Sequence, residues 1–324
     1  MNAMRFDGRV ALITGAGTGM GRAYAEFLAG RGAKIVVSDA GTATDGTGAN
    51  SERAQQVVDA ICAAGGEASA WTANLIDDEG ARGAVRHAIA TFGRLDILIH
   101  NAGIALSDYF ANETAERMDR LLGINARAAC ILAREAWPVM VEQAYGRIVL
   151  IGSTAMYGMG GSVHYSMAKA SYLGLARSLG EEGEPAGIKA NLVCPGAATR
   201  LAETMAESEF KTWLFETMKP ELVTPIVAYL AHEICAVTGE SFSTAGGRLA
   251  KIVVGETYGI VDRELTLEKV PQLLGEVMAT DKLHLNRSFG EFAPVMMEAL
   301  GFTPSEPLNQ IMDIKDDGGT ATAE

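Results

Sequence analysis

The feature that most constrains the fold of this chain is the alternation of short aliphatic runs with longer helical patterns. The runs are apolar almost throughout, as expected of strands that are buried on both faces. They are Val10 to Ile13, Lys34 to Ser38, Leu95 to Ile99, Arg147 to Ile151 and Ile188 to Val193, with Glu67 to Thr72 as a weaker sixth. This alternation predicts an α/β fold, a doubly wound parallel sheet with crossover helices on both faces.

The sheet and its helices account for residues 1–255, which we expect to form a single domain. Residues 256–312 form a C-terminal extension, in which helical patterns cover Leu265 to Met278 and Phe289 to Leu300. Residues 313–324 are an acidic tail rich in Gly, Thr and Ala, and we expect this tail to be disordered.

A loop after the second strand is longer than the usual connection from strand to helix. It runs from Ala40 to Asn50, is rich in Gly, Thr and Ala, and is followed by Ser51 as a candidate N-cap. The loop is interpreted either as a flap or as a surface insertion.

Charge and cysteine content limit the partners and the compartment. The net charge of −13 disfavours nucleic acid and anionic membranes, and no apolar run is long enough for a membrane span. The four cysteines are far apart and form no C-x-x-C pair, which favours a reducing cytoplasm. No metal site is expected.

A glycine-rich turn follows the first strand. Thr14 to Gly21 reads T-G-A-G-T-G-M-G and leads into the helical pattern Arg22 to Ala29. Small residues there let the backbone approach a pyrophosphate and point a helix N-terminus at it. The alternative is an ordinary tight turn, but the position between strand and helix favours a dinucleotide site.

Asp39 ends the second strand, about 20 residues beyond the glycines, where a carboxylate can bind the adenosine ribose hydroxyls. A 2′-phosphate would meet that negative charge, and neither Thr18 nor Ala40-Gly41 offers a cation. NAD is therefore favoured over NADP. The alternative for Asp39 is a solvated aspartate at a strand end.

Tyr165 and Lys169 lie four residues apart at the start of an apolar-periodic helix and so share one face. An adjacent ammonium should bring the pKa of the phenol down towards the working range of a general base. Ser153 follows a strand at the same sheet edge that receives the cofactor. Its hydroxyl can hold a substrate oxygen while Tyr165 exchanges a proton.

These motifs together resemble the short-chain dehydrogenase/reductase superfamily over residues 6 to 250. The matching elements are T-G-x-x-x-G-x-G at Thr14 to Gly21, N-A-G at Asn101 to Gly103, Asn125, Ser153, Tyr165 with Lys169, and Pro195-Gly196. The resemblance implies a Rossmann-type fold and an NAD-dependent enzyme that interconverts a secondary alcohol and a ketone.

The resemblance also implies roles for individual residues. Tyr165 would be the general acid/base, Lys169 would lower its pKa and bind the nicotinamide ribose, and Ser153 would polarise the substrate oxygen. Asn125 would hold a water that relays protons to Lys169. The expected cofactor-binding residues are Gly15, Gly17, Thr18, Gly19, Met20, Gly21, Asp39, Asn74, Leu75, Asn101, Ala102, Gly103, Tyr165, Lys169, Pro195, Gly196 and Thr199.

Three positions depart from the family pattern. His100 replaces the first asparagine of N-N-A-G, and a buried, hydrogen-bonded histidine is favoured over a catalytic one because it ends an apolar strand. The interval from Ser153 to Tyr165 is one residue short, which leaves Thr154 as a possible stand-in for Ser153. Asn74 occupies the place of an aspartate that often contacts adenine.

Within the superfamily, the chain is most similar to the dehydrogenase domains of peroxisomal multifunctional enzymes of type 2, which act on (3R)-hydroxyacyl-CoA and 17β-hydroxysteroids. The similar segments are Gly8 to Leu12, Gly21 to Ala25, the loop after Asp39, Tyr145 to Ile148, Tyr157-Gly158 and Met218 to Glu221. The similarity implies an apolar substrate, either an acyl-CoA or a steroid.

Methionines and aromatic residues agree with an apolar substrate, although they would equally suit ordinary core. They are Leu201, Met205, Trp213, Leu214 and Met218 on one stripe, and Met156, Tyr157 and Met159 after the serine. The cations available for a CoA ester are Arg200, Lys219, Arg248 and Lys251, each of which surface solvation would also explain.

Two further interpretations concern turnover and assembly. A cofactor-binding sensor or scaffold without turnover stays an alternative, because fold does not fix function. Small residues at Ala168, Ser171 and Gly174 would let the helix that carries Tyr165 pack closely against another helix. Family members pair through such helices, so a homodimer or homotetramer is expected.

Overall fold

The computed structural model describes residues 4–198 and 206–303, and the chain divides into two compact units, residues 1–251 and 252–324. The first unit contains an eight-stranded sheet with the strand order β3-β2-β1-β4-β5-β6-β7-β8. Its strands are β1 (Val10–Thr14), β2 (Lys34–Ser38), β3 (Glu67–Trp71), β4 (Ile97–His100), β5 (Gly146–Ile151), β6 (Ile188–Gly196), β7 (Ser241–Ala245) and β8 (Arg248–Ile252). The expected Rossmann-type doubly wound sheet is confirmed.

The strand order reverses beside β1, which pairs in parallel with β2 on one side and with β4 on the other. All pairs from β3 to β7 are parallel, and the apolar runs predicted this for the strands from β3 to β6. In an open α/β sheet, ligands bind outside the carboxyl ends of the strands at such a switch point. The topology therefore puts the candidate site where Thr14, Ser38 and His100 end their strands.

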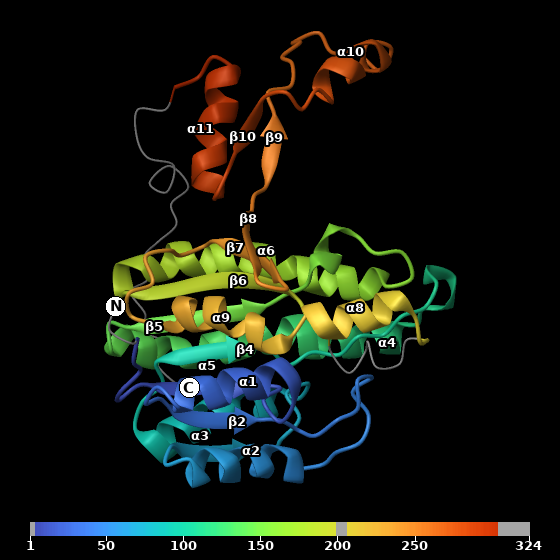
Figure 1. Ribbon diagram of the computed structural model, residues 1–324. Coiled ribbons are helices and arrows are strands. Elements are labelled where there is room, and N and C mark those ends of the chain that lie inside the picture. Colours follow the sequence, from blue (N-terminus) through green and yellow to red (C-terminus); the bar gives the residue numbers. More distant parts are fainter. Residues whose placement is uncertain (1–3, 199–205, 304–324) are drawn as a thin grey trace. The chain divides into compact units, whose positions relative to one another are not determined.

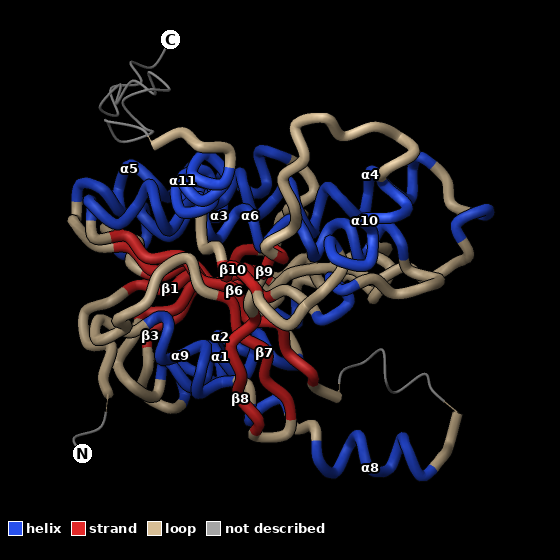
Figure 2. The backbone as a smooth tube through the Cα atoms, turned by 90° about the horizontal axis from the view of Figure 1, so that it is seen from above, coloured by secondary structure: helices blue, strands red, loops and turns tan. Residues whose placement is uncertain are grey.

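Helices cover both faces of the sheet (Figures 1 and 2). One face carries α1 (Gly19–Ala29), α2 (Glu52–Ala63) and α9 (Thr224–Ala231). The other face carries α3 (Asp78–Phe92), α4 (Ala115–Leu122), α5 (Ala128–Glu142) and α6 (Val163–Gly183). Strand residues such as Leu12 and Leu98 are fully buried between the two layers, as a parallel sheet with covered faces requires.

Two strands that the sequence alone did not indicate extend the sheet beyond β6. β7 pairs in parallel with β6, and only Gly246 and Gly247 connect β7 to β8. Both glycines have positive φ, 54° and 84°, as a type I′ hairpin turn demands. A further helix, α8 (Glu209–Thr217), precedes α9.

The second unit holds two helices and a small sheet. The helices are α10 (Val270–Val277) and α11 (Phe289–Ala299), within the two expected helical patterns. The sheet pairs β9 (Gly255–Thr257) with β10 (Leu283–Leu285) in antiparallel fashion, and the sequence did not indicate it. The expected disordered tail, residues 313–324, lies outside the described residues.

The start of α2 corrects the expected cap. Ser51 occupies the N-cap position, but its side chain makes no capping hydrogen bond. Instead, Asn50 Oδ1 accepts from the backbone nitrogen of Glu52 at 3.0 Å. Asparagine is as good a cap as serine, and the backbone places Asn50 nearer to the free N–H.

Candidate active site

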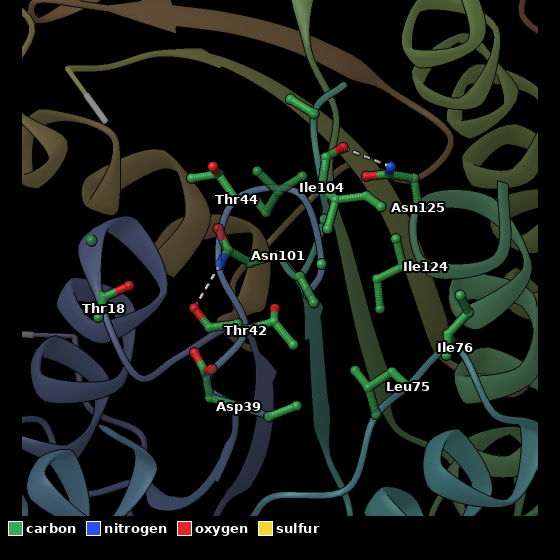
Figure 3. Close-up of a pocket in the computed structure, with 18 of the residues that line it drawn as sticks. Thr18, Asp39, Thr42, Thr44, Leu75, Ile76, Asn101, Ile104, Ile124 and Asn125 are labelled. Carbon is green, nitrogen blue, oxygen red and sulfur yellow. Dashed lines mark hydrogen bonds between the residues drawn. The ribbon is translucent and has the colours of Figure 1, made fainter. Parts of the chain in front are cut away.

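A pocket of about 500 Å³ opens at the carboxyl edge of the sheet, between the ends of β1, β2 and β4 (Figure 3). Most of the expected cofactor-binding residues line it. These are Gly15, Thr18, Gly19, Met20, Asp39, Asn74, Leu75, Asn101, Ala102, Gly103, Tyr165 and Lys169. Asn125 also lines the pocket, so the structure brings the glycine-rich turn and most of the expected catalytic residues to one place.

The glycine-rich turn forms a cradle in which side chains would collide. A Cβ at Gly15, where φ is +63°, would lie 2.9 Å from Ala102 Cα, and one at Gly21 would lie 2.2 Å from the carbonyl oxygen of Gly15. Helix α1 begins directly after this turn, with Thr18 as its N-cap residue. A backbone that carries so few side chains, next to a helix N-terminus, can approach and bind the pyrophosphate of a dinucleotide.

Asp39 joins the glycine-rich turn to the loop that follows β2. Its Oδ2 accepts from Gly17 N at 2.8 Å, and its Oδ1 accepts from Gly41 N at 2.7 Å. The carboxylate is therefore held in place from two sides, at the pocket wall. Gly17 does not line the pocket itself but positions this carboxylate.

The N-A-G segment is hydrogen-bonded to the end of β1. Asn101 Nδ2 donates to the carbonyl oxygens of Thr14 at 3.1 Å and Gly15 at 3.0 Å. His100 is fully buried, and its Nδ1 lies 3.1 Å from the Thr14 hydroxyl. The expectation of a buried, hydrogen-bonded histidine is thus confirmed.

Lys169 lies on the second turn of α6 and is almost fully buried. Its Nζ donates to the carbonyl oxygen of Ile151 at 3.0 Å and lies 6.0 Å from the centre of the Tyr165 ring. Burial lowers the pKa of Lys169 from 10.5 to about 8, because the site offers the ammonium little solvation. A substantial fraction of this lysine is therefore neutral near pH 8.

The pKa of Tyr165 departs from the sequence expectation. Burial raises it above the ordinary value of 10, and a hydrogen bond with Ser153 lowers it only in part. Among the described residues, no neighbouring ammonium lowers the pKa of Tyr165, contrary to the expectation. The physical reason is desolvation, which penalises the phenolate and the Lys169 ammonium alike.

Asn125 lies in a turn of π-helix, Gly123–Arg127, between α4 and α5. Its Nδ2 donates to the carbonyl oxygens of Ile104 at 2.9 Å and Leu121 at 3.1 Å. Its Oδ1 is buried without a hydrogen-bond partner among the residues described. This oxygen and Lys169 Nζ both border Gly103, where a Cβ would lie 2.3 Å from the oxygen and 3.3 Å from the nitrogen.

A buried acceptor next to a buried amine is an arrangement that a water molecule can complete. Because Gly103 has no side chain, the space between Asn125 Oδ1 and Lys169 Nζ is open.

Ser153 and Thr154 differ in their surroundings. Ser153 follows β5, accepts from Ala155 N at 3.1 Å and lies close enough to Tyr165 to lower the pKa of its phenol. Thr154 begins a short 3-10 helix and is exposed. The geometry favours Ser153 over Thr154 as the partner of the phenol.

Five expected cofactor residues, Gly17, Gly21, Pro195, Gly196 and Thr199, are not among the residues that line the described pocket. Pro195 and Gly196 end β6, paired with Thr244 and Ala245 of β7. Thr199 lies outside the residues that the structure describes. Gly21, like Gly17, supports the turn from behind, packed on the Gly15 carbonyl.

Several residues that line the pocket were not expected from the sequence. They are Ser38, Ala40, Thr42, Ala43, Thr44, Gly46, Ile76, Ile104, Ala105, Arg120, Ile124, Ile151, Gly152 and Ala198. The unusual length of the loop after β2 was the only signal for Thr42 to Gly46. Arg120 lies on helix α4, and no feature of the sequence indicated that it borders the pocket.

The described members of the apolar set considered for the substrate do not line the described pocket; they are Met156, Tyr157, Met159, Trp213, Leu214 and Met218. Trp213 on α8 is 45% exposed and Tyr157 is 66% exposed, so these two residues are not part of the core. The ring of Trp213 stacks on Phe210 at a centroid distance of 5.7 Å. Leu201 and Met205 lie outside the described residues, as does Arg200.

The described cations considered for a CoA ester, Lys219, Arg248 and Lys251, are not among the residues that line the pocket. Arg248 donates to Ser243 Oγ at 3.1 Å, and Lys251 forms an ion pair with Glu240 at 2.7 Å. Lys219 is exposed. Among the residues described, no cluster of His, Cys, Asp and Glu is arranged to hold a metal ion.

Comparison with known proteins agrees with this site. The family model described as short chain dehydrogenase matches residues 9–210. Because this match covers more than half of the chain, the protein belongs to the short-chain dehydrogenase/reductase family and is an oxidoreductase of the class that acts on CH–OH groups.

Particular relatives include peroxisomal multifunctional enzymes. The chain is 35% identical to peroxisomal multifunctional enzyme A of Dictyostelium discoideum, over 94% of this chain and 68% of that protein. It is 38% identical to peroxisomal multifunctional enzyme type 2 of Drosophila melanogaster, over 92% of this chain and 50% of that enzyme. The chain thus spans about two thirds and one half of the lengths of these relatives.

Solved structures show the same relationship. The structure of the full-length Drosophila enzyme superposes with a TM-score of 0.76 at 30% identity, over 92% of this chain and 50% of that one. A 7α-hydroxysteroid dehydrogenase, in complex with NADH and 7-oxo glycochenodeoxycholic acid, superposes with a TM-score of 0.68 at 26% identity, over 75% and 95% of the two chains. None of the helices within residues 4–198 and 206–303 is both long and apolar enough to cross a membrane.

Proposed function

We propose that this protein is an NAD-dependent dehydrogenase that interconverts a secondary alcohol and a ketone on an apolar substrate. The observation that carries the proposal is that Tyr165 and Lys169 line one pocket at the sheet edge, with the Ser153 side chain close enough to Tyr165 to lower the pKa of its phenol. A phenol and a hydroxyl that lie close together can share one substrate oxygen between them.

The pocket fits a nicotinamide dinucleotide. The bare turn at Gly15 and Gly21 would hold the pyrophosphate, and Asp39 would bind the adenosine ribose hydroxyls. When bound, the nicotinamide supplies the acceptor or donor of a hydride. The carboxylate of Asp39 favours NAD over NADP because a 2′-phosphate would be repelled, and the NADH in the related hydroxysteroid dehydrogenase supports this preference.

Residues of this chain would transfer the proton of the substrate hydroxyl. Tyr165 would take the proton of the substrate hydroxyl in oxidation and return it in reduction, while Ser153 holds the oxygen in place. Lys169, with a pKa of about 8, can pass a proton onward near neutral pH. The free Oδ1 of Asn125 would hold the water that connects Lys169 to solvent.

The substrate that we favour is a 3-hydroxyacyl-CoA or a hydroxysteroid. Support comes from the similarity to multifunctional enzymes and from the steroid bound to the related structure. The experiment follows NADH absorbance during oxidation of (3R)- and (3S)-hydroxyacyl-CoA esters and of hydroxysteroids, with NADP in parallel. Inactivity on both classes, together with turnover of a small polar alcohol, would rule out this substrate assignment.

Tyr165→Phe tests whether the protein turns over at all. The enzyme interpretation predicts that this variant loses hydride transfer while NADH binding is preserved, because the ring remains and only the hydroxyl that exchanges the proton is lost. Tyr258→Phe is the matched control, since Tyr258 lies in the second unit and its side chain is 63% exposed. Equal turnover of wild type and Tyr165→Phe would instead favour a different proton donor.

A homodimer or homotetramer and a cytoplasmic location belong to the same proposal. On α6, Ser171 and Gly174 are exposed and leave room for another helix, whereas Ala168 is buried in the core and cannot contribute. All four cysteines are free, which supports a reducing compartment. Light scattering of the wild type and cell fractionation test these two points.

A further inference from the structure

The loop after β2 is a compact segment with a closed base. The backbone nitrogen of Asn50 donates to the carbonyl oxygen of Ala40 at 3.2 Å, and Gly41 packs directly on Asn50. Arg53 on α2 donates to the carbonyl oxygen of Thr42 at 2.9 Å. Residues 42–49, which we call the strap, therefore leave and re-enter the fold at nearly the same point, as in an Ω-loop.

The strap has an ordered interior of its own. The backbone nitrogen of Ala43 donates to the carbonyl oxygen of Thr47 at 2.8 Å, and Gly46 N donates to the carbonyl oxygen of Ala43 at 3.0 Å. Asp45 Oδ1 accepts from both the backbone nitrogen and the hydroxyl of Thr47, at 2.9 and 2.7 Å. These bonds hold the strap in one shape, so it can act as a unit.

The tip of the strap contacts the opposite wall of the pocket. The carbonyl oxygen of Thr44 accepts from Ala105 N at 3.3 Å, directly after the N-A-G segment. Gly46 lies against Ile104, because a Cβ at Gly46 would be 3.2 Å from Ile104 Cγ2 and 3.9 Å from Arg120 Cδ. Thr44 and Ile104 border the same pocket (Figure 3).

An electrostatic attraction supports this bridge. Hydrogen bonds from Thr47 lower the pKa of Asp45, and the positive charge of Arg120 lowers it further. Arg120 lines the pocket, and among the residues that the structure describes its guanidinium takes part in no hydrogen bond. Its charge is thus available to the strap and to a bound ligand.

We propose that the strap spans the adenosine half of the cofactor pocket, latched to Ile104, Ala105 and Arg120, and that release of the dinucleotide requires this latch to open. The inference rests on the proposed function, because it takes the pocket to bind NAD. It assigns the extra loop a role in cofactor retention, in addition to the recognition of the ribose by Asp39.

The test measures the dissociation rate constant of NADH by stopped-flow fluorescence, with excess NAD as the displacing ligand. Asp45→Asn keeps the acceptor oxygen for Thr47 but removes the charge that Arg120 attracts, and should raise the rate constant about two- to fivefold. Asp119→Asn, which removes an exposed carboxylate from the same helix as Arg120, is the matched control and should change nothing.

A second variant excises residues 42–49 and joins Gly41 to Asn50, which already lie in contact. Without the strap, the dissociation rate constant should rise about tenfold or more. A double variant of Asp45→Asn with Arg120→Gln should release NADH no faster than the faster single variant, because both substitutions remove the same attraction between Asp45 and Arg120.

The outcomes separate the two levels of inference. If the wild type binds NADH tightly and NADH dissociates from the excised variant at an unchanged rate, the proposed role of the strap is wrong and the proposed cofactor still stands. Failure of the wild type to bind NADH would overturn both. Faster dissociation in the excised variant, at an unchanged melting temperature, is the result that we expect.

Discussion

The hydroxyl of Thr14 lies 3.1 Å from Nδ1 of His100, and its other bonds fix which nitrogen of the histidine carries the proton. The same oxygen accepts from the backbone nitrogens of Asn101 and Ala102, both at 3.0 Å. A hydroxyl that accepts twice has only its own proton left to donate, and it donates this proton to Nδ1. His100 is therefore the Nε2–H tautomer, with the Nε2–H close to the π-helix that carries Asn125.

Thr14→Val tests this network. The variant keeps the shape of the side chain but removes the acceptor of two backbone N–H groups and the donor to His100. It should lower the free energy of unfolding by about 1–3 kcal/mol, because buried polar groups lose their partners. Denaturant unfolding measures this loss, and Thr14→Ser, which keeps the hydroxyl, should retain most of the stability.

Nitrogen chemical shifts of His100 give an independent check on the tautomer. In the wild type, Nδ1 should show the shift of an unprotonated ring nitrogen and Nε2 that of a protonated one. The reverse assignment would mean that Thr14 does not donate to His100, and the network as described would be wrong.

Acid stability should depend on the same histidine. Burial, followed by the positive charge of Lys169, lowers the pKa of His100 from 6.5 to about 3. Between these two values the unfolded chain binds a proton that the folded chain does not, so stability falls as pH drops through this window. From pH 7.5 to pH 4.5, the wild type should lose about 2 to 3 kcal/mol more than His100→Asn.

Urea unfolding of both proteins at the two pH values measures the difference. The carboxyl groups titrate equally in both proteins, so their contributions to stability cancel in the comparison. Equal losses in wild type and His100→Asn would show that His100 is protonated in the folded chain.

The sequence predicted those parts of the fold that a strong local pattern encodes. Apolar runs in the sequence predicted the aliphatic strands β1, β2, β4, β5 and β6. The glycine-rich turn predicted a dinucleotide-binding motif. β7 has the sequence SFSTA, which carries too little aliphatic character for such a reading. Its strand conformation comes from pairing with β6, a contact that no local pattern shows.

The candidate residues were predicted from the sequence, and their catalytic roles stay predictions. Tyr165 and Lys169 were predicted from their spacing and Ser153 from its position at the sheet edge, and the structure places Tyr165 and Lys169 in one pocket. The raised pKa of Tyr165 was not predicted, because it depends on burial that only the packed structure creates. Arg120 was missed for the same reason, since its place in the pocket depends on how α4 packs against distant segments.

The choice between Ser153 and Thr154 can be settled by a pair of substitutions. Ser153→Ala removes the hydroxyl that lowers the pKa of Tyr165, and kcat should fall about 10²- to 10³-fold. Thr154→Val removes an exposed hydroxyl and should leave kcat within about twofold of the wild type. Steady-state kinetics with one substrate decides, and a larger loss in Thr154→Val would move the role to Thr154.

Gly103→Ala tests whether Asn125 and Lys169 must keep the space between them open. The added methyl group would lie 2.3 Å from Asn125 Oδ1 and 3.3 Å from Lys169 Nζ. The amide of Asn125 cannot swing aside without breaking its bonds to Ile104 and Leu121, so the proton relay should be displaced. We expect kcat to fall about 10²-fold, because small misplacements of catalytic groups are costly.

Gly275→Ala is the control for Gly103→Ala, measured by the same steady-state assay. A Cβ at Gly275 meets nothing within 4 Å on the exposed helix α10 of the second unit, so activity should be unchanged. Thermal unfolding should even show a gain of about 0.5–1 kcal/mol, since alanine is the better helix former. If Gly103→Ala kept wild-type kcat, proton transfer would not pass between Asn125 and Lys169, and the relay would have to take another route from Tyr165.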